Sequence, residues 1–100
     1  MLDQELIIKK LEKALYLTSD VLNQSLVADI SSYIHAREWG LAFDIMCENL
    51  YEYELPISQQ TYKLLEDIGL SLHFEKDYWE MLKPQIDPGL ADLQFNRNGS

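Results

Sequence analysis

The spacing of large apolar side chains in the stretch 37–58 constrains the fold of this chain more than any other feature. These side chains recur every three or four residues, so at about 100° per residue they fall on one side of a helix. They are Trp39, Phe43, Met46, Leu50 and Tyr53. The helix has to end before Leu55-Pro56, because proline disfavours a helical conformation in the residue that precedes it. We therefore predict a central helix over this stretch, with Trp39 in the core.

Three carboxylates follow the opposite side of the same helix and form what we call the acidic stripe. Asp44, Glu48 and Glu52 stand at i, i+4 and i+8 with no basic residue within a turn on that side, and like charges at this spacing repel by about 0.2–0.5 kcal/mol per pair. The stripe is therefore either a solvated face or a binding face for a basic partner. Apolar side chains border it, which indicates a helix packed within a bundle or one that meets its core on one face and a partner on the other. They are Leu41, Ile45 and Tyr51.

Two helices are predicted before this stretch. The first begins after an Asp3 cap and runs to about Leu17. Its apolar face holds Leu6, Ile7, Leu11, Ala14 and Leu15. The stretch 18–20 indicates a break and the cap of a second helix, which ends near His35 and lies antiparallel to the first because the connection is short. Its apolar face holds Val21, Leu22, Leu26, Ile30, Tyr33 and Ile34.

Two helices are predicted after it. Ser58 is a good cap for a fourth helix, in which Gly69 either permits close packing or frays the last turn. Its apolar face holds Tyr62, Leu65, Ile68 and Leu72. A short fifth helix over 76–83 is stopped by Pro84, and Tyr78, Trp79 and Leu82 face inward from it.

No stretch alternates polar and apolar residues for long enough to indicate a strand. The predicted fold class is therefore all-α, a compact bundle of four to five helices in a single domain over residues 1–86. The stretch 87–100 is rich in turn residues, and we expect it to be a loosely ordered C-terminal tail.

The charge of the chain is strongly negative and unevenly distributed. The formal net charge is −9, and the stretch 40–82 carries nine acids against two bases. Such a field repels nucleic acid and anionic membranes and attracts basic proteins. No apolar run approaches the roughly 20 residues of a membrane span, and the N-terminus lacks the features of a signal peptide. With one cysteine and therefore no internal disulfide, these features predict a cytoplasmic protein.

Residue patterns for catalysis or cofactor binding do not occur in the sequence. The Glu-x-x-His motif of di-iron bundles is missing, no glycine-rich loop is present, and Cys47 next to Glu48 is expected to be a packing residue. A helix-turn-helix regulator is disfavoured because the helix after Ser58 carries Glu66 and Asp67 against a single lysine. We therefore expect no enzymatic activity, no cofactor and no metal.

Four motifs together resemble a known family. They are REWGLA at 37–42, CENLYE at 47–52, LPIS at 55–58 and YWEMLKP at 78–84. The chain resembles the small helical immunity proteins of bacterial polymorphic toxin systems, in particular the MafI-type and the contact-dependent-inhibition (CdiI) type. The resemblance covers roughly residues 25–84. It implies a cytosolic single-domain protein that forms a 1:1 complex with the C-terminal toxin domain delivered by a neighbouring cell and blocks it. The paired toxins are often ribonucleases, some of them EndoU-like.

A ribonuclease active site is a basic cleft, so an acidic helical surface is expected to cover it. We expect no nucleic acid, membrane or small-molecule substrate as a partner. The residues predicted to bind the toxin are Asp44, Glu48, Tyr51, Glu52, Glu54, Glu66 and Asp67. Two other hypotheses remain open: an adaptor or regulatory subunit for another basic protein, and a carboxylate-based metal protein that uses the clustered acids.

Overall fold

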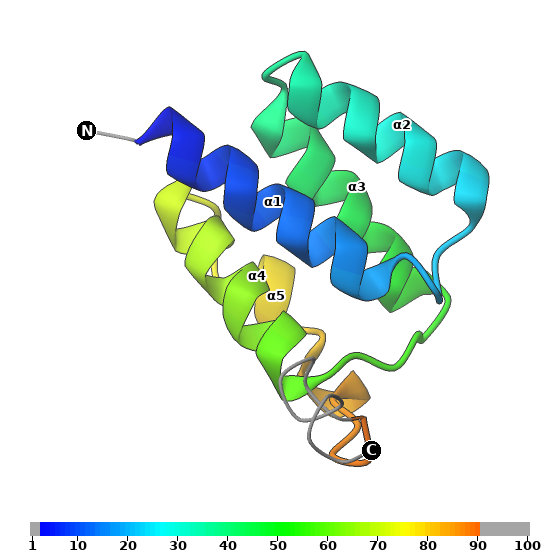
Figure 1. Cartoon of the computed structure of the whole chain (residues 1–100). Helices are drawn as coiled ribbons and strands as arrows, with labels where there is room; N and C mark the ends of the chain where they lie inside the picture. Colours follow the sequence, from blue (N-terminus) through cyan, green and yellow to red (C-terminus); the bar gives the residue numbers. More distant parts are fainter. Residues whose placement is uncertain (1–2, 91–100) are drawn as a thin grey trace, which may run out of the picture.

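Five α-helices and one short 3-10 helix make up the chain between residues 3 and 90, the part that the computed structural model describes (Figure 1). They are α1 (Gln4–Thr18), α2 (Gln24–His35), α3 (Trp39–Glu52), α4 (Gln59–Ser71), α5 (Asp77–Glu80) and the 3-10 helix η1 (Lys83–Gln85). Over these residues no strand forms, although an isolated parallel bridge joins Ile57 to Ile86. The predicted all-α class is confirmed. None of the helices in this part of the chain is long and apolar enough to cross a membrane.

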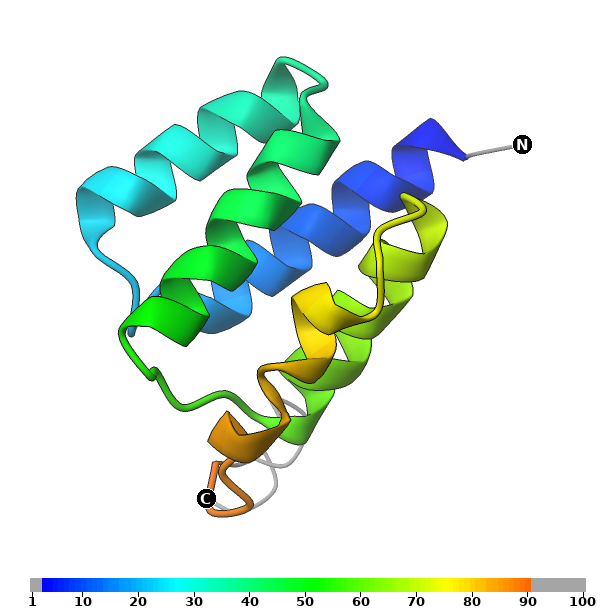
Figure 2. The same ribbon diagram turned by 180° about the vertical axis from the view of Figure 1, so that it is seen from behind.

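The helices pack around α1, which contacts α2, α3 and α4. The second helix returns along α1, as its short connection predicts, and α3 packs against both (Figure 1). The fourth helix lies along the other side of α1, and α5 packs against both α3 and α4 (Figure 2). This arrangement places the short α5 and η1 beside the C-terminal half of α3.

Two of the predicted helix starts are confirmed by their caps, and one is wrong. The Asp3 carboxylate accepts from Leu6 N at 3.2 Å, and Ser58 Oγ accepts from Thr61 N at 3.1 Å. The second helix is capped by Asn23 instead of a residue in 18–20. The reason is that α1 continues through Thr18, whose hydroxyl donates to Ala14 O at 2.9 Å within that helix.

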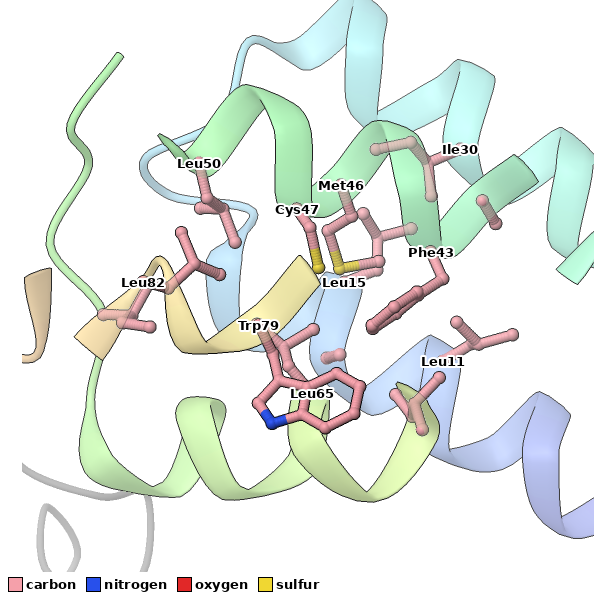
Figure 3. Close-up of a cluster of buried hydrophobic side chains, with 14 of the residues drawn as sticks. Leu11, Leu15, Ile30, Phe43, Met46, Cys47, Leu50, Leu65, Trp79 and Leu82 are labelled. Atoms are coloured by element: carbon pink, nitrogen blue, oxygen red, sulfur yellow. The ribbon is translucent and has the colours of Figure 1, made fainter. Parts of the chain in front are cut away.

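The core contains side chains from all five α-helices (Figure 3). Its residues in the close-up include Leu11, Leu15, Ile30, Phe43, Met46, Cys47, Leu50, Leu65, Trp79 and Leu82. Each is buried, so the predicted inward face of α3 is confirmed at Phe43, Met46 and Leu50. Each such side chain contributes on the order of 1.5–3 kcal/mol by leaving water.

Three apolar predictions are corrected at the helix ends. Tyr53 was assigned to the inner face of α3, but that helix ends at Glu52 and the Tyr53 side chain is 67% exposed. Leu6, in the first turn of α1, is 47% exposed instead of buried. Trp39 begins α3 and packs against the core while remaining partly exposed. Terminal turns project beyond the neighbouring helices, so their side chains meet fewer partners than the periodicity indicates.

Gly69 permits close packing, the first of the two roles considered for it. A Cβ at this position would overlap the ring of Trp79, which is 2% exposed. The fifth helix is shorter than predicted, and Pro84 lies inside η1 instead of ending α5. Proline suits a first helical turn because its fixed φ is compatible with it and the missing N–H has no partner there. Beyond a turn at 87–90, the predicted C-terminal tail lies outside the described residues.

Candidate protein-binding groove

An open groove runs along the surface between α3 and the segment formed by α5 and η1. Its volume is about 940 Å³. We call it the α3–α5 groove. It is lined by Asp44, Glu48, Tyr51, Glu52, Glu54, Pro56, Asp77, Tyr78, Met81, Pro84 and Gln85. Five of the seven residues predicted to bind a partner are among them, so the structure gathers most of the predicted site in one place.

The acidic stripe forms one side of this groove. Asp44, Glu48 and Glu52 stand one helical turn apart, so their Cα atoms follow the helix in steps of about 6 Å. Asp44 is half-buried, and the other two are exposed. The ion pairs between side chains in residues 3–90 are Lys10–Asp67 and Glu12–His35, and neither includes a groove residue.

The opposite side comes from α5 and η1, and sequence reasoning missed it. Asp77 adds a fifth carboxylate to those of the stripe and Glu54. Tyr78, Met81 and Pro84 contribute ring and apolar surface. No lysine or arginine of the described chain lines the groove. The high acid content of the stretch 40–82 was the available signal, but it did not reveal which face of α5 turns towards α3.

Gln85 ties the two sides together at the C-terminal end of α3. Its Nε2 donates to Leu50 O at 2.7 Å and to Leu55 O at 2.9 Å. The backbone adds two bonds, from Ile57 N to Gln85 O at 3.1 Å and from Asp87 N to Ile57 O at 2.9 Å. The last carbonyls of a helix lack partners within the helix. Gln85 therefore caps α3 and fixes the distance between α3 and η1.

Glu54 reaches the groove from an unusual backbone conformation. Its φ is 50°, in the left-handed region. Leu55 N donates to Leu50 O at 3.0 Å and Glu54 N donates to Tyr51 O at 3.1 Å, the pattern of a Schellman cap. Arg37 after α2 and His73 after α4 have the same conformation, with φ of 64° and 63°. Glycine is the usual residue at this position, because a side chain there is strained.

Two tyrosines border the groove in different ways. Tyr51 is 52% exposed on α3. Tyr78 is half-buried, and its ring meets Phe74 edge-on at a centroid distance of 4.7 Å. Phe74 in turn meets Phe43 at 4.9 Å, and Phe43 is fully buried. A chain of three rings thus connects the core to the groove and holds Tyr78 in place.

Two predicted partner-binding residues do not belong to this site. Glu66 and Asp67 lie on α4 and do not line the groove. The Asp67 carboxylate pairs with Lys10 Nζ of α1 at 2.6 Å. In the sequence they form a second acidic region, distinct from the stripe. The packing of α4 against α1 separates them from it.

The interpretation of Cys47 as a packing residue is confirmed. Its side chain is fully buried, and burial together with the neighbouring Asp44 carboxylate raises the pKa of its thiol far above the usual range. A thiol that stays protonated is a poor nucleophile. Within residues 3–90 no three histidine, cysteine or carboxylate side chains come together in a way that would hold a metal ion.

Comparison with known proteins gives no match for this chain, whether among protein-family models, curated proteins or solved structures. The groove combines five carboxylates with no lysine or arginine from residues 3–90.

Proposed function

We propose that this chain is an immunity protein that binds a cognate toxin domain, a basic ribonuclease, in a 1:1 complex and neutralises it without catalysis of its own. The observation that carries the proposal is the set of five carboxylates along one groove that no lysine or arginine of the described chain neutralises. The resemblance of four sequence motifs to those of immunity proteins supports the same function and implies that binding takes place in the cytoplasm.

The physical basis is charge complementarity. A ribonuclease attracts its polyanionic substrate with a cluster of lysine and arginine side chains. The carboxylates of the groove take the place of the substrate phosphates. Three of these carboxylates, Asp44, Glu48 and Glu52, follow one another over about 12 Å of helix. Such complementarity raises the association rate at low salt, and pairs that become buried contribute roughly 2–5 kcal/mol when one partner is removed.

The function is tested by rescue. A gene for a secreted toxin is expected directly upstream, and co-expression of this chain should restore growth to cells that make the toxin domain. The purified proteins should co-elute on size exclusion at 1:1. If the cells are not rescued and no complex forms, the proposal is wrong. A complex without rescue would instead identify an adaptor for a basic protein.

The binding face is tested by single alanine variants at two salt concentrations. Asp44→Ala, Glu48→Ala and Glu52→Ala should lower the association rate or raise the dissociation rate, and we expect the largest effect at Glu48, in the middle of the stripe. The controls are Glu66→Ala and Asp67→Ala, which remove acids of α4 outside the groove. Unchanged rates for the stripe variants together with slower association for the controls would move the interface to α4.

A further inference from the structure

We infer that the α3–α5 groove binds an extended, arginine-bearing segment of the partner, with guanidinium groups held between the carboxylates and the rings of Tyr51 and Tyr78. The inference rests on the proposed function for the existence of a basic partner. It goes further by naming the side chain that the groove selects.

The two sides of the groove require a cationic occupant. Asp44, Glu48 and Glu52 line it from α3, and Asp77 lines it from α5. Covering these carboxylates with a neutral surface would take them out of water without compensation, which costs several kcal/mol per charge. A cation placed between α3 and α5 has carboxylates on both sides, an arrangement that a flat acidic surface does not provide.

The groove lining other than its carboxylates favours arginine over lysine. The ring and apolar part of the lining consists of Tyr51, Tyr78, Met81, Pro56 and Pro84. A lysine ammonium is compact and strongly hydrated, so it gains little from this surface. A guanidinium is planar and weakly hydrated, stacks on aromatic rings and still donates two parallel hydrogen bonds to one carboxylate.

The aromatic part of the groove is already ordered without a partner. Tyr78 is held edge-on by Phe74, which packs against the buried ring of Phe43. Gln85 fixes the distance between α3 and η1 through its bonds to Leu50 O and Leu55 O. Tyr78 and η1 therefore lose little conformational freedom when a partner binds, which favours affinity.

The spacing of the stripe indicates the register of the occupant. Successive carboxylates on α3 stand about 6 Å apart along the helix. Alternate residues of an extended segment stand roughly 6.6–6.8 Å apart on the same side. A segment of the form Arg-x-Arg-x-Arg thus places one arginine against each of Asp44, Glu48 and Glu52. A helix, about 10–12 Å across with its side chains, would fill much more of the groove.

The test uses the full chain and two synthetic peptides, Gly-Arg-Ser-Arg-Ser-Arg-Gly and the same peptide with lysine in place of arginine. Each is titrated into the ¹⁵N-labelled protein at about 0.15 M salt, followed by amide chemical shifts. We expect shifts confined to 44–56 and 77–85, and a dissociation constant about three-fold or more lower for the arginine peptide, as the stacking energy of exposed rings implies.

A pair of tyrosine variants separates stacking from charge. Tyr51→Leu removes a groove ring, and Tyr53→Leu removes a ring that is 67% exposed and does not line the groove. Tyr51→Leu should lower the preference for arginine, whereas Tyr53→Leu should leave it unchanged. Both side chains are exposed, so both variants are expected to fold, and circular dichroism checks this expectation.

Two results would overturn the inference. One is equal affinity for the two peptides, and the other is a set of shifts that extends equally over the acids of α4. The outcome for the toxin is independent of these. A toxin domain that binds while the peptides show no arginine preference leaves the proposed function standing and removes this inference. Arginine-selective peptide binding without any toxin complex leaves this inference standing and removes the proposed function.

Discussion

Gly69→Ala is the substitution for which helix propensity and packing predict opposite results. Gly69 lies in α4, and replacing a helical glycine by alanine ordinarily stabilises by about 0.8–1.0 kcal/mol. In this structure the added Cβ would overlap two ring carbons of Trp79 and come within 3.1 Å of Phe43 Cζ. Both rings are buried, so neither has free space to move into. Packing should therefore determine the sign.

The expected size follows from these two contributions. Overpacking a well-filled core costs about 1–3 kcal/mol, and contacts with two rigid rings belong to the upper part of that range. Subtracting the gain in helix propensity leaves a net loss of about 1–2 kcal/mol. For a domain of this size the loss lowers the melting temperature by roughly 4–16 °C.

The assay is urea denaturation followed by circular dichroism at 222 nm. Gly40→Ala in α3 is the matched control, because its Cβ would meet the Phe74 ring at an ordinary 3.7 Å, and this variant should be as stable as the parent or up to about 1 kcal/mol more stable. Combining Gly69→Ala with Trp79→Phe should recover part of the loss as a coupling energy. A Gly69→Ala protein as stable as the parent would refute the packing argument.

The remaining predictions concern Gln85, Cys47 and the three residues with positive φ. Gln85→Ala should destabilise by about 1–3 kcal/mol in urea denaturation, because Leu50 O at the end of α3 and Leu55 O just beyond it each lose the hydrogen bond from the Gln85 amide, and Gln85→Glu should do so by more. Folding raises the pKa of the Cys47 thiol, so the thiol stays protonated in the folded state at pH values where it ionises in the unfolded chain. Its contribution to the free energy of unfolding is therefore complete below about pH 8.5 and falls as the pH rises above that value. Cys47→Ala should flatten the alkaline loss of stability by up to about 1.4 kcal/mol per pH unit in reducing buffer. Glu54→Gly should stabilise by about 0.5–1 kcal/mol and weaken partner binding, whereas Arg37→Gly and His73→Gly should stabilise similarly without affecting binding.

The features that sequence predicted well are those with local causes. Asp3 and Ser58 cap helices because their side chains reach amides three residues further on, and Pro56 limits α3 through the conformation of its neighbour. The acidic stripe was predicted because helical periodicity alone places its members on one face. The prediction that Tyr53 faces the core was wrong, because the apolar periodicity continues one residue past the end of α3.

The features that sequence did not predict depend on how separate helices dock. Asp77 and Tyr78 became part of the groove only because α5 packs against α3 and α4. Glu66 and Asp67 were predicted to bind a partner as well, but α4 packs against α1, where Asp67 pairs with Lys10, and neither residue lines the groove. The Gln85 side chain bonds to Leu50 and Leu55, which stand 35 and 30 residues earlier in the chain, and no local sequence pattern indicates such a contact.

The closure of the groove by residues 83–87 has a consequence for protein synthesis. Helices α1 to α4 are complete once residue 71 has been made, whereas the bonds of Gln85 and Asp87 to the end of α3 and to Ile57 need the chain that follows. Contacts over 30 or more residues also form late, because a long loop has to close first. A nascent chain therefore displays the acidic stripe before it has a groove. Under the proposed function, the groove becomes competent to bind only when residues 83–87 dock, and a released chain truncated before residue 83 should keep its four long helices yet bind the toxin domain more weakly.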